Sequence, residues 1–186
     1  MQSPNKPSKG PKIMDGSQNY SPLSETEKLR FRQDSRYQQR MRVMNIIAGA
    51  FFVAAGLYFG LFESGILHKA AGEKPASDLW MVIIPCAVGS AVLSMVIPAV
   101  ILHKVPVSAG FEAVANQGSA AMTVALAAGE AIVIFGMIGP FLAMPASVSY
   151  SLMVGGVVVM GFALSRVRPQ IADALVAALA RESDKR

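Results

Sequence analysis

The sequence predicts an all-α integral membrane protein with four transmembrane helices. Hydrophobic residues make up 53% of the 186 residues and gather in four long apolar runs. The charged residues lie mostly in the first 42 and the last 21 positions, so the net charge of +5 describes basic ends around a neutral core. Between Ala113 and Ser165 the only charged side chain is Glu130. Such a run is typical of membrane-spanning segments and excludes the surface of a soluble domain.

Composition and motifs argue against several function classes. The basic ends flank apolar runs, so we expect anionic lipid headgroups and not nucleic acid as their partner. Cys86 is the only cysteine, and His68 and His103 stand alone, so we expect no disulfide, no metal site and no cofactor. The sequence has no His-Glu-x-x-His, no Gly-x-Ser-x-Gly and no phosphate-binding glycine loop, which predicts that it is not an enzyme.

The N-terminal part predicts a tail followed by a basic helix. Residues 1–20 are rich in Pro, Ser, Lys, Gly and Asn, which predicts disorder. Residues 21–42 predict a basic juxtamembrane helix, and Ser24 with Glu27 three positions later fits a capping box at its start. A solvated helix with no lipid role is the alternative for this segment.

The first two spans follow from uninterrupted apolar runs. Residues 43–62 contain no charge and match the thickness of a bilayer. Gly56 and Gly60 form a Gly-x-x-x-Gly pair, which we expect to serve as a packing face within the monomer and not as a dimer seam. A loop of mixed charge then leads to the second span, residues 79–102, which two internal prolines are expected to kink.

A second loop at 103–118 precedes the last two spans. We expect the third at 119–143 and the fourth at 150–165, where Gly155 and Gly156 offer close backbone contact. Pro169 is expected to stop the fourth span and to open an amphipathic helix at 169–182, lying on the membrane or against the loops. Arginines concentrate beside the N- and C-terminal ends, so the lysine and arginine bias predicts that both ends are cytoplasmic.

Glu130 is expected at the midpoint of the third span. A charge there costs about 3 kcal/mol on insertion scales, and a protonated carboxyl costs far less, so we expect a neutral side chain at pH 7 unless a cation lies nearby. Ala121, Ala125 and Gly129 recur every four residues and predict a small-residue ridge for tight packing. Glu130 adjoins that ridge, so we expect it to face the bundle interior or a subunit seam.

Hydroxyl groups of the second span are the expected partners of Glu130. Antiparallel spans place Ser90 and Ser94 at a similar depth, and no lysine, arginine or histidine lies there. Two interpretations remain open. The carboxyl either hydrogen-bonds its neighbours and sets the helix register, or it forms a proton or cation site together with Ser90 and Ser94.

The segment Ala127-Ala128-Gly129-Glu130-Ala131 resembles the carboxylate-bearing helix of subunit c of rotary ATP synthases. In that family the glutamate takes up and releases one ion at each step of the ring. The resemblance covers one helix and implies ion translocation centred on Glu130.

The layout of the whole chain resembles a widespread group of small bacterial four-span membrane proteins. The features that carry this resemblance are Glu130 between small residues, Phe135 after it, and Arg168-Pro169 leading into a tail with Ile171 and Leu175. It implies an integral protein of the bacterial cytoplasmic membrane. Our prediction is a structural or accessory role, with the lipid bilayer, a second copy or a larger membrane complex as partners; ion translocation is the alternative, and an enzyme ranks third.

Overall fold

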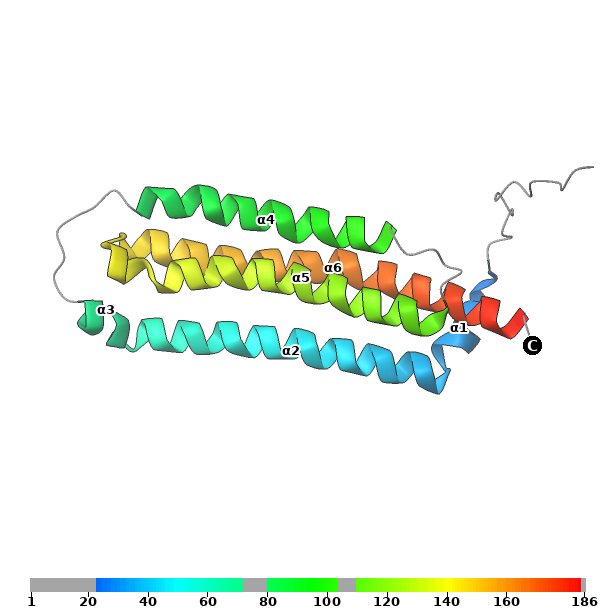
Figure 1. Cartoon of the computed structure of the whole chain (residues 1–186). Helices are drawn as coiled ribbons and strands as arrows, with labels where there is room; N and C mark the ends of the chain where they lie inside the picture. The colour runs from blue at the N-terminus through cyan, green and yellow to red at the C-terminus, as the bar shows by residue number, and fades with distance from the viewer. Residues whose placement is uncertain (1–22, 72–79, 104–109, 185–186) are drawn as a thin grey trace, which may run out of the picture.

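Four long helices make up most of the part of the chain that the structure describes. The computed structural model describes residues 23–71, 80–103 and 110–184, so the predicted tail at 1–20 lies outside the described residues. Successive long helices run in opposite directions (Figure 1): they are α2 (Ser35–Glu63), α4 (Trp80–His103), α5 (Phe111–Met137) and α6 (Ala146–Asp184). Each is long and apolar enough to cross a membrane, which confirms the predicted all-α fold with four candidate spans.

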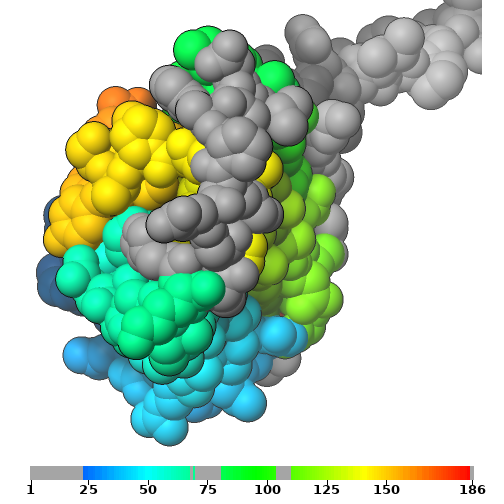
Figure 2. Space-filling model, turned by 90° about the vertical axis from the view of Figure 1, so that its left-hand side faces the viewer, coloured from blue at the N-terminus to red at the C-terminus, as the bar shows by residue number. Residues whose placement is uncertain are grey.

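Helix α5 is the centre of the bundle. It packs most extensively against α6 and also contacts α4 and α2. Helices α2 and α4 flank the α5–α6 pair on opposite sides, as Figures 1 and 2 both show. Twelve of the 27 residues of α5 are buried, against 13 of the 39 residues of α6 and five of the 29 residues of α2. The helix that carries Glu130 is therefore the one around which the others assemble.

Helix α5 begins earlier and ends earlier than the predicted span at 119–143. At its start, Gly110 has no side chain to cap the helix, and the Phe111 N–H donates instead to the Glu182 carboxylate of α6 at 2.9 Å. At its end, Pro140 follows within the 3-10 turn η2 (Gly139–Leu142). Packing with α6 thus supplies the missing cap and adds two turns of helix ahead of the predicted start.

Helix α6 is one continuous helix where the sequence predicted a span at 150–165 and a separate helix at 169–182. The predicted break at Pro169 is not present. Ile171, Leu175 and Leu179 are each at most 2% exposed beyond the proline, so this segment packs into the bundle and extends it. Burial of these apolar side chains offsets the hydrogen bond that Pro169 cannot make.

Two short helices lie at opposite ends of the bundle. Helix α1 (Glu25–Arg32) begins with the predicted capping box of Ser24 and Glu27, which the structure confirms. The predicted basic helix at 21–42 is interrupted after α1, because the Asp34 side chain accepts the Arg36 N–H and starts α2. Helix α3 (Ile66–Ala71) contacts η2 at the other end, which Figure 2 views directly.

The outer surface of the bundle is apolar over much of its length. Large hydrophobic side chains point outward, among them Val53 at 65%, Leu57 at 64% and Val158 at 63% exposure. An apolar surface that extends over three long helices is too large to be stably exposed to water, and it fits contact with lipid. The structure therefore supports an integral membrane protein.

Candidate intramembrane carboxylate site

Glu130 is hydrogen-bonded to a tyrosine of the first span. Its Oε1 accepts the Tyr58 hydroxyl at 3.3 Å, and both side chains are partly buried. Tyr58 comes from α2 and Glu130 from α5, and these two helices run in the same direction side by side. Glu130 lies in the last third of α5 and not at its midpoint. The hydrogen bond therefore joins α2 and α5 nearer to the η2 end of α5 than to its middle.

The predicted serine partners do not bond to Glu130. The Ser94 hydroxyl is fully buried and donates to the backbone carbonyl of Ala125 at 2.9 Å. Ser90 is partly buried, and no hydrogen bond joins it to Glu130 among the described residues. The partner thus comes from α2 and not from α4, because Ser94 points to the backbone of α5 one to two turns before the carboxylate.

The predicted small-residue ridge is buried as expected. Ala121, Ala125 and Gly129 are all buried, and Gly129 faces Gly156 of α6. A Cβ atom at Gly156 would lie 2.8 Å from the Gly129 carbonyl oxygen and 2.8 Å from the Val133 nitrogen. At these separations only glycine fits, so the α5–α6 contact depends on backbone against backbone.

Three other predicted packing glycines face outward. A Cβ atom at Gly56, Gly60 or Gly155 would meet nothing within 4 Å. The Gly-x-x-x-Gly pair of α2 is therefore not used inside the monomer, which corrects the sequence-based expectation. The reason is rotation of α2, which turns Ala48 and Ala55 toward the core.

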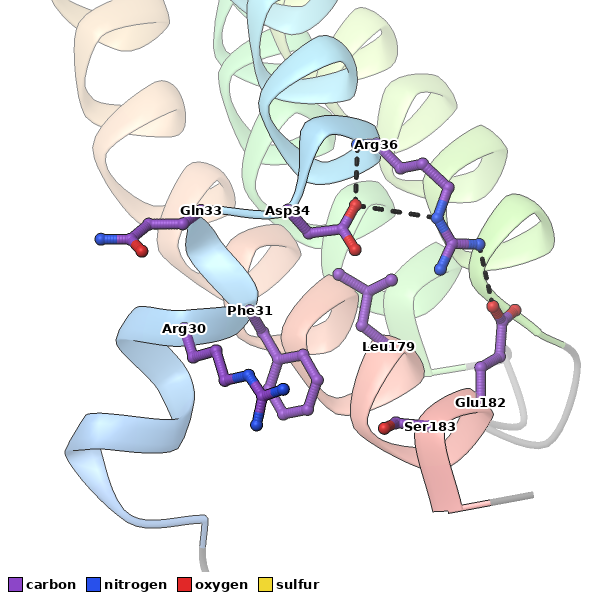
Figure 3. A pocket seen from close by; sticks show the side chains of 8 residues that line it. All are labelled: Arg30, Phe31, Gln33, Asp34, Arg36, Leu179, Glu182 and Ser183. Carbon is purple, nitrogen blue, oxygen red and sulfur yellow. Dashed lines mark hydrogen bonds and ion pairs between the residues drawn. The ribbon is translucent and has the colours of Figure 1, made fainter. Parts of the chain in front are cut away.

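A second group of polar contacts lies at the end of the bundle where α1 meets the C-terminal half of α6, which we call the polar end. Glu182 accepts from the Arg36 guanidinium at 3.0 Å in addition to the Phe111 N–H. Arg36 also lies over the Phe111 ring, 5.3 Å from its centroid. Figure 3 shows Arg36 between Asp34 and Glu182, beside a hollow of about 340 Å³ that Phe31 and Leu179 also line.

Further ion pairs connect the same helices. Arg32 of α1 pairs with Asp173 of α6 at 3.5 Å, and Arg40 of α2 pairs with Glu112 of α5. Together with Arg36 they join α1, α2 and α5 to the C-terminal half of α6. These side chains are substantially exposed, so each pair contributes little to stability and mainly sets helix register.

Sequence reasoning missed Tyr58 and Glu182. Tyr58 had a detectable signal: apart from Asn45 near the start, it is the only side chain with a hydroxyl or amide in residues 43–62. A buried tyrosine hydroxyl usually finds a partner, and Glu130 is the charged group available in the spans. Glu182 carried no such signal, because its role depends on α6 continuing past Pro169.

The chemistry available at Glu130 is that of a carboxyl group beside one phenol. Among the described residues no cluster of three or more His, Cys, Asp or Glu side chains is present that could hold a metal ion. The carboxyl can hold a proton or accept a hydrogen bond from Tyr58. No family model, curated protein or solved structure matches this chain, so both resemblances remain predictions.

Proposed function

We propose that the chain is a small integral membrane protein of structural or accessory role, without catalytic activity of its own. In this proposal it crosses the bacterial cytoplasmic membrane four times and keeps both ends in the cytoplasm. Its function is to hold a rigid helix bundle in the bilayer, against a second copy or against partner subunits.

The observation that carries the proposal is the way α5 joins the other spans. Tyr58 of α2 donates to the Glu130 side chain, and Ser94 of α4 donates to the Ala125 carbonyl. Gly129 meets Gly156 of α6 at backbone distance. Each of the other three long helices is thus attached to α5, and Glu130 is engaged in one of these attachments. A carboxyl that links helices supports a structural role.

The arrangement of charge supports the proposed orientation. The end of the bundle with α1 and the C-terminal half of α6 holds Arg36, Arg40 and Arg181, whereas α3 at the other end holds Lys69. Cytoplasmic flanks carry the excess of arginine and lysine in membrane proteins. The outward position of Gly56 and Gly60 leaves the α2 face available to lipid or to a helix of another subunit.

The substitution Glu130→Gln tests the structural role. A neutral amide resembles a protonated acid in shape and still accepts the Tyr58 hydroxyl, so the variant should assemble and support growth as the wild type does. Glu63→Gln, at the exposed C-terminal end of α2, is the matched control. Loss of a cellular or transport phenotype with Glu130→Gln, in protein that remains folded and monodisperse, would contradict the proposal.

A second function, proton or cation binding at Glu130, is favoured by one observation. Glu130 is only partly buried, and the exposed positions Thr123 and Ala127 lie on its side of α5. A carboxyl near an exposed strip of small residues is accessible from the lipid. Labelling with a hydrophobic carbodiimide separates the two functions, since the reagent requires a protonated and accessible acid. Labelling that a cation suppresses, or that follows pH, would favour the ion site.

A further inference from the structure

A hollow between α4 and α6 lies beside the deepest arginine of α6. It has a volume of about 200 Å³, with Ser94, Met95 and Ala99 on the α4 side and Phe162, Arg166 and Gln170 on the α6 side. Ala99 precedes the last residue of α4 by about one helical turn. Arg166 therefore lies alongside the apolar helix and not beyond its end.

Arg166 differs from three arginines at the end of the bundle that holds α1. Arg32, Arg36 and Arg40 each pair with a carboxylate, whereas no carboxylate within the described ranges pairs with Arg166. Its guanidinium lies instead over the Phe162 ring, 4.9 Å from the centroid, and Phe162 is itself 48% exposed. A cation at this level next to apolar side chains is costly unless an anion accompanies it.

We propose that this hollow binds the headgroup of an anionic phospholipid. Arg166 would pair with the phosphate, and Gln170, one turn further along α6, would donate to the phosphate or glycerol oxygens. The acyl chains would lie along Met95 and Phe162 and continue over the apolar outer surface of α4, where Val92 and Val96 are exposed. A basic pocket between spans on the cytoplasmic side is a known kind of lipid site.

Ser94 explains why the hollow persists between the helices. Its hydroxyl is committed to the Ala125 carbonyl, so it holds α4 against α5 and leaves the α4–α6 side open. Arg168 lies two residues from Arg166 on a different face of α6 and does not line the hollow. It carries the same charge near the same level and therefore serves as a matched control.

The experiment measures lipid binding by the purified full chain, from the rise of its thermal midpoint with added lipid. Phosphatidylglycerol, phosphatidylcholine and inorganic phosphate are titrated separately into the wild type, Arg166→Gln, Arg168→Gln and Ala99→Phe. We expect phosphatidylglycerol to bind the wild type in preference to phosphatidylcholine. Arg166→Gln should weaken that binding about five-fold, and Arg168→Gln should not. Ala99→Phe should weaken it by filling the hollow while every charge is kept.

Three results would overturn the lipid site. They are equal binding of the two lipids by the wild type, equal losses in Arg166→Gln and Arg168→Gln, or full binding by Ala99→Phe. Saturation by inorganic phosphate alone would assign the site to a free anion instead. The inference rests on the proposed membrane protein, and insertion of each variant into liposomes tests that separately. Insertion without lipid preference removes only this inference, whereas failure of the wild type to insert removes both.

Discussion

The two halves of α6 differ in which side chains they expose and which they bury, although they belong to one uninterrupted helix. Between Ser151 and Ser165 the exposed side chains are all apolar, such as Val158 at 63% exposure, and the buried residues include glycine and methionine. After Arg166 the exposed positions include Arg168 and Asp173, and the buried ones are Ile171, Leu175 and Leu179. The outward-facing side chains of the first half suit contact with lipid, and those of the second half suit contact with water.

The contrast shows which force holds each half together. Lipid tails are as apolar as a leucine, so burying hydrophobic side chains gains little within the membrane, and close backbone packing with a few hydrogen bonds must suffice. At the end near the termini, where charged side chains surround an apolar core, the hydrophobic effect operates as in a soluble bundle. Four substitutions or pairs of substitutions test this division.

The largest effect is expected from filling the glycine contact in the membrane half. Gly156→Leu should prevent the bundle from folding, because its Cβ would lie 2.8 Å from the Gly129 carbonyl oxygen and the backbone must move. Gly155→Leu, one residue earlier, should be tolerated, since a Cβ there meets nothing within 4 Å. Size-exclusion chromatography after heating in detergent measures both. Similar losses from the two variants would refute the proposed α5–α6 contact.

Removing apolar side chains should affect the two halves differently. Leu175→Ala truncates a side chain that is fully buried at the polar end and should cost about 2 to 5 kcal/mol. Val158→Ala removes a 63% exposed side chain in the membrane half and should stay within about 0.5 kcal/mol. Thermal midpoints of the two variants in one detergent provide the comparison. A larger loss for Val158→Ala would mean that a protein partner and not lipid covers this face.

The division between the halves also explains how far the sequence could predict the fold. Long apolar runs indicate directly that a segment lies in lipid, so the four candidate spans were predictable. The burial of Ala121, Ala125 and Gly129 was predictable from the four-residue spacing of small side chains. The rotation of a span is not encoded in the same way, because apolar residues surround the whole helix. For that reason Gly56 and Gly60 were predicted to face inward and in fact face outward.

The errors at Pro169 and Glu130 have a common cause. A proline is a local stop signal, and only the tertiary burial of Ile171 and Leu175 reveals that the helix continues. Likewise the choice between Ser94 and Tyr58 as partner of Glu130 depends on which helix turns its polar residue toward the carboxyl. Both outcomes are decided by packing between distant segments, which periodicity within one segment does not report.

The bond between Tyr58 and Glu130 should make a modest contribution. A double-mutant cycle of Tyr58→Phe and Glu130→Ala, each of which removes the bond, should give a coupling energy of about 0.6 to 1.7 kcal/mol, between the average and the largest value for hydrogen bonds between membrane helices. The 3.3 Å distance favours the lower part of that range. Unfolding in mixed micelles measures the coupling, and Ser94→Ala, which breaks the bond to Ala125, serves as an independent reference. A coupling near zero would mean that the two side chains are neighbours without a bond.

The smallest effect concerns pH at the capping box of α1. Hydrogen bonds from the Ser24 hydroxyl and from its backbone N–H hold the pKa of the Glu27 carboxyl below its ordinary value. A carboxyl whose pKa is lower in the folded state contributes stability above its ordinary pKa of about 4.3, and that contribution is lost as pH falls through the lowered value. Acidification should therefore loosen the start of α1.

The effect should stay local, because α1 has no buried residue. Hydrogen exchange of the α1 amides, corrected for the intrinsic pH dependence, should accelerate as the pH falls through that window while α5 exchange stays constant. Ser24→Ala should accelerate it about five-fold at neutral pH and should abolish most of the pH response. Glu25→Gln is the control, since the pKa of Glu25 is lowered mainly by Lys28. Equal acceleration of amide exchange in α5 would mean that α1 and the membrane core unfold as one cooperative unit. That result would contradict the separation of the bundle into a membrane half and a polar end.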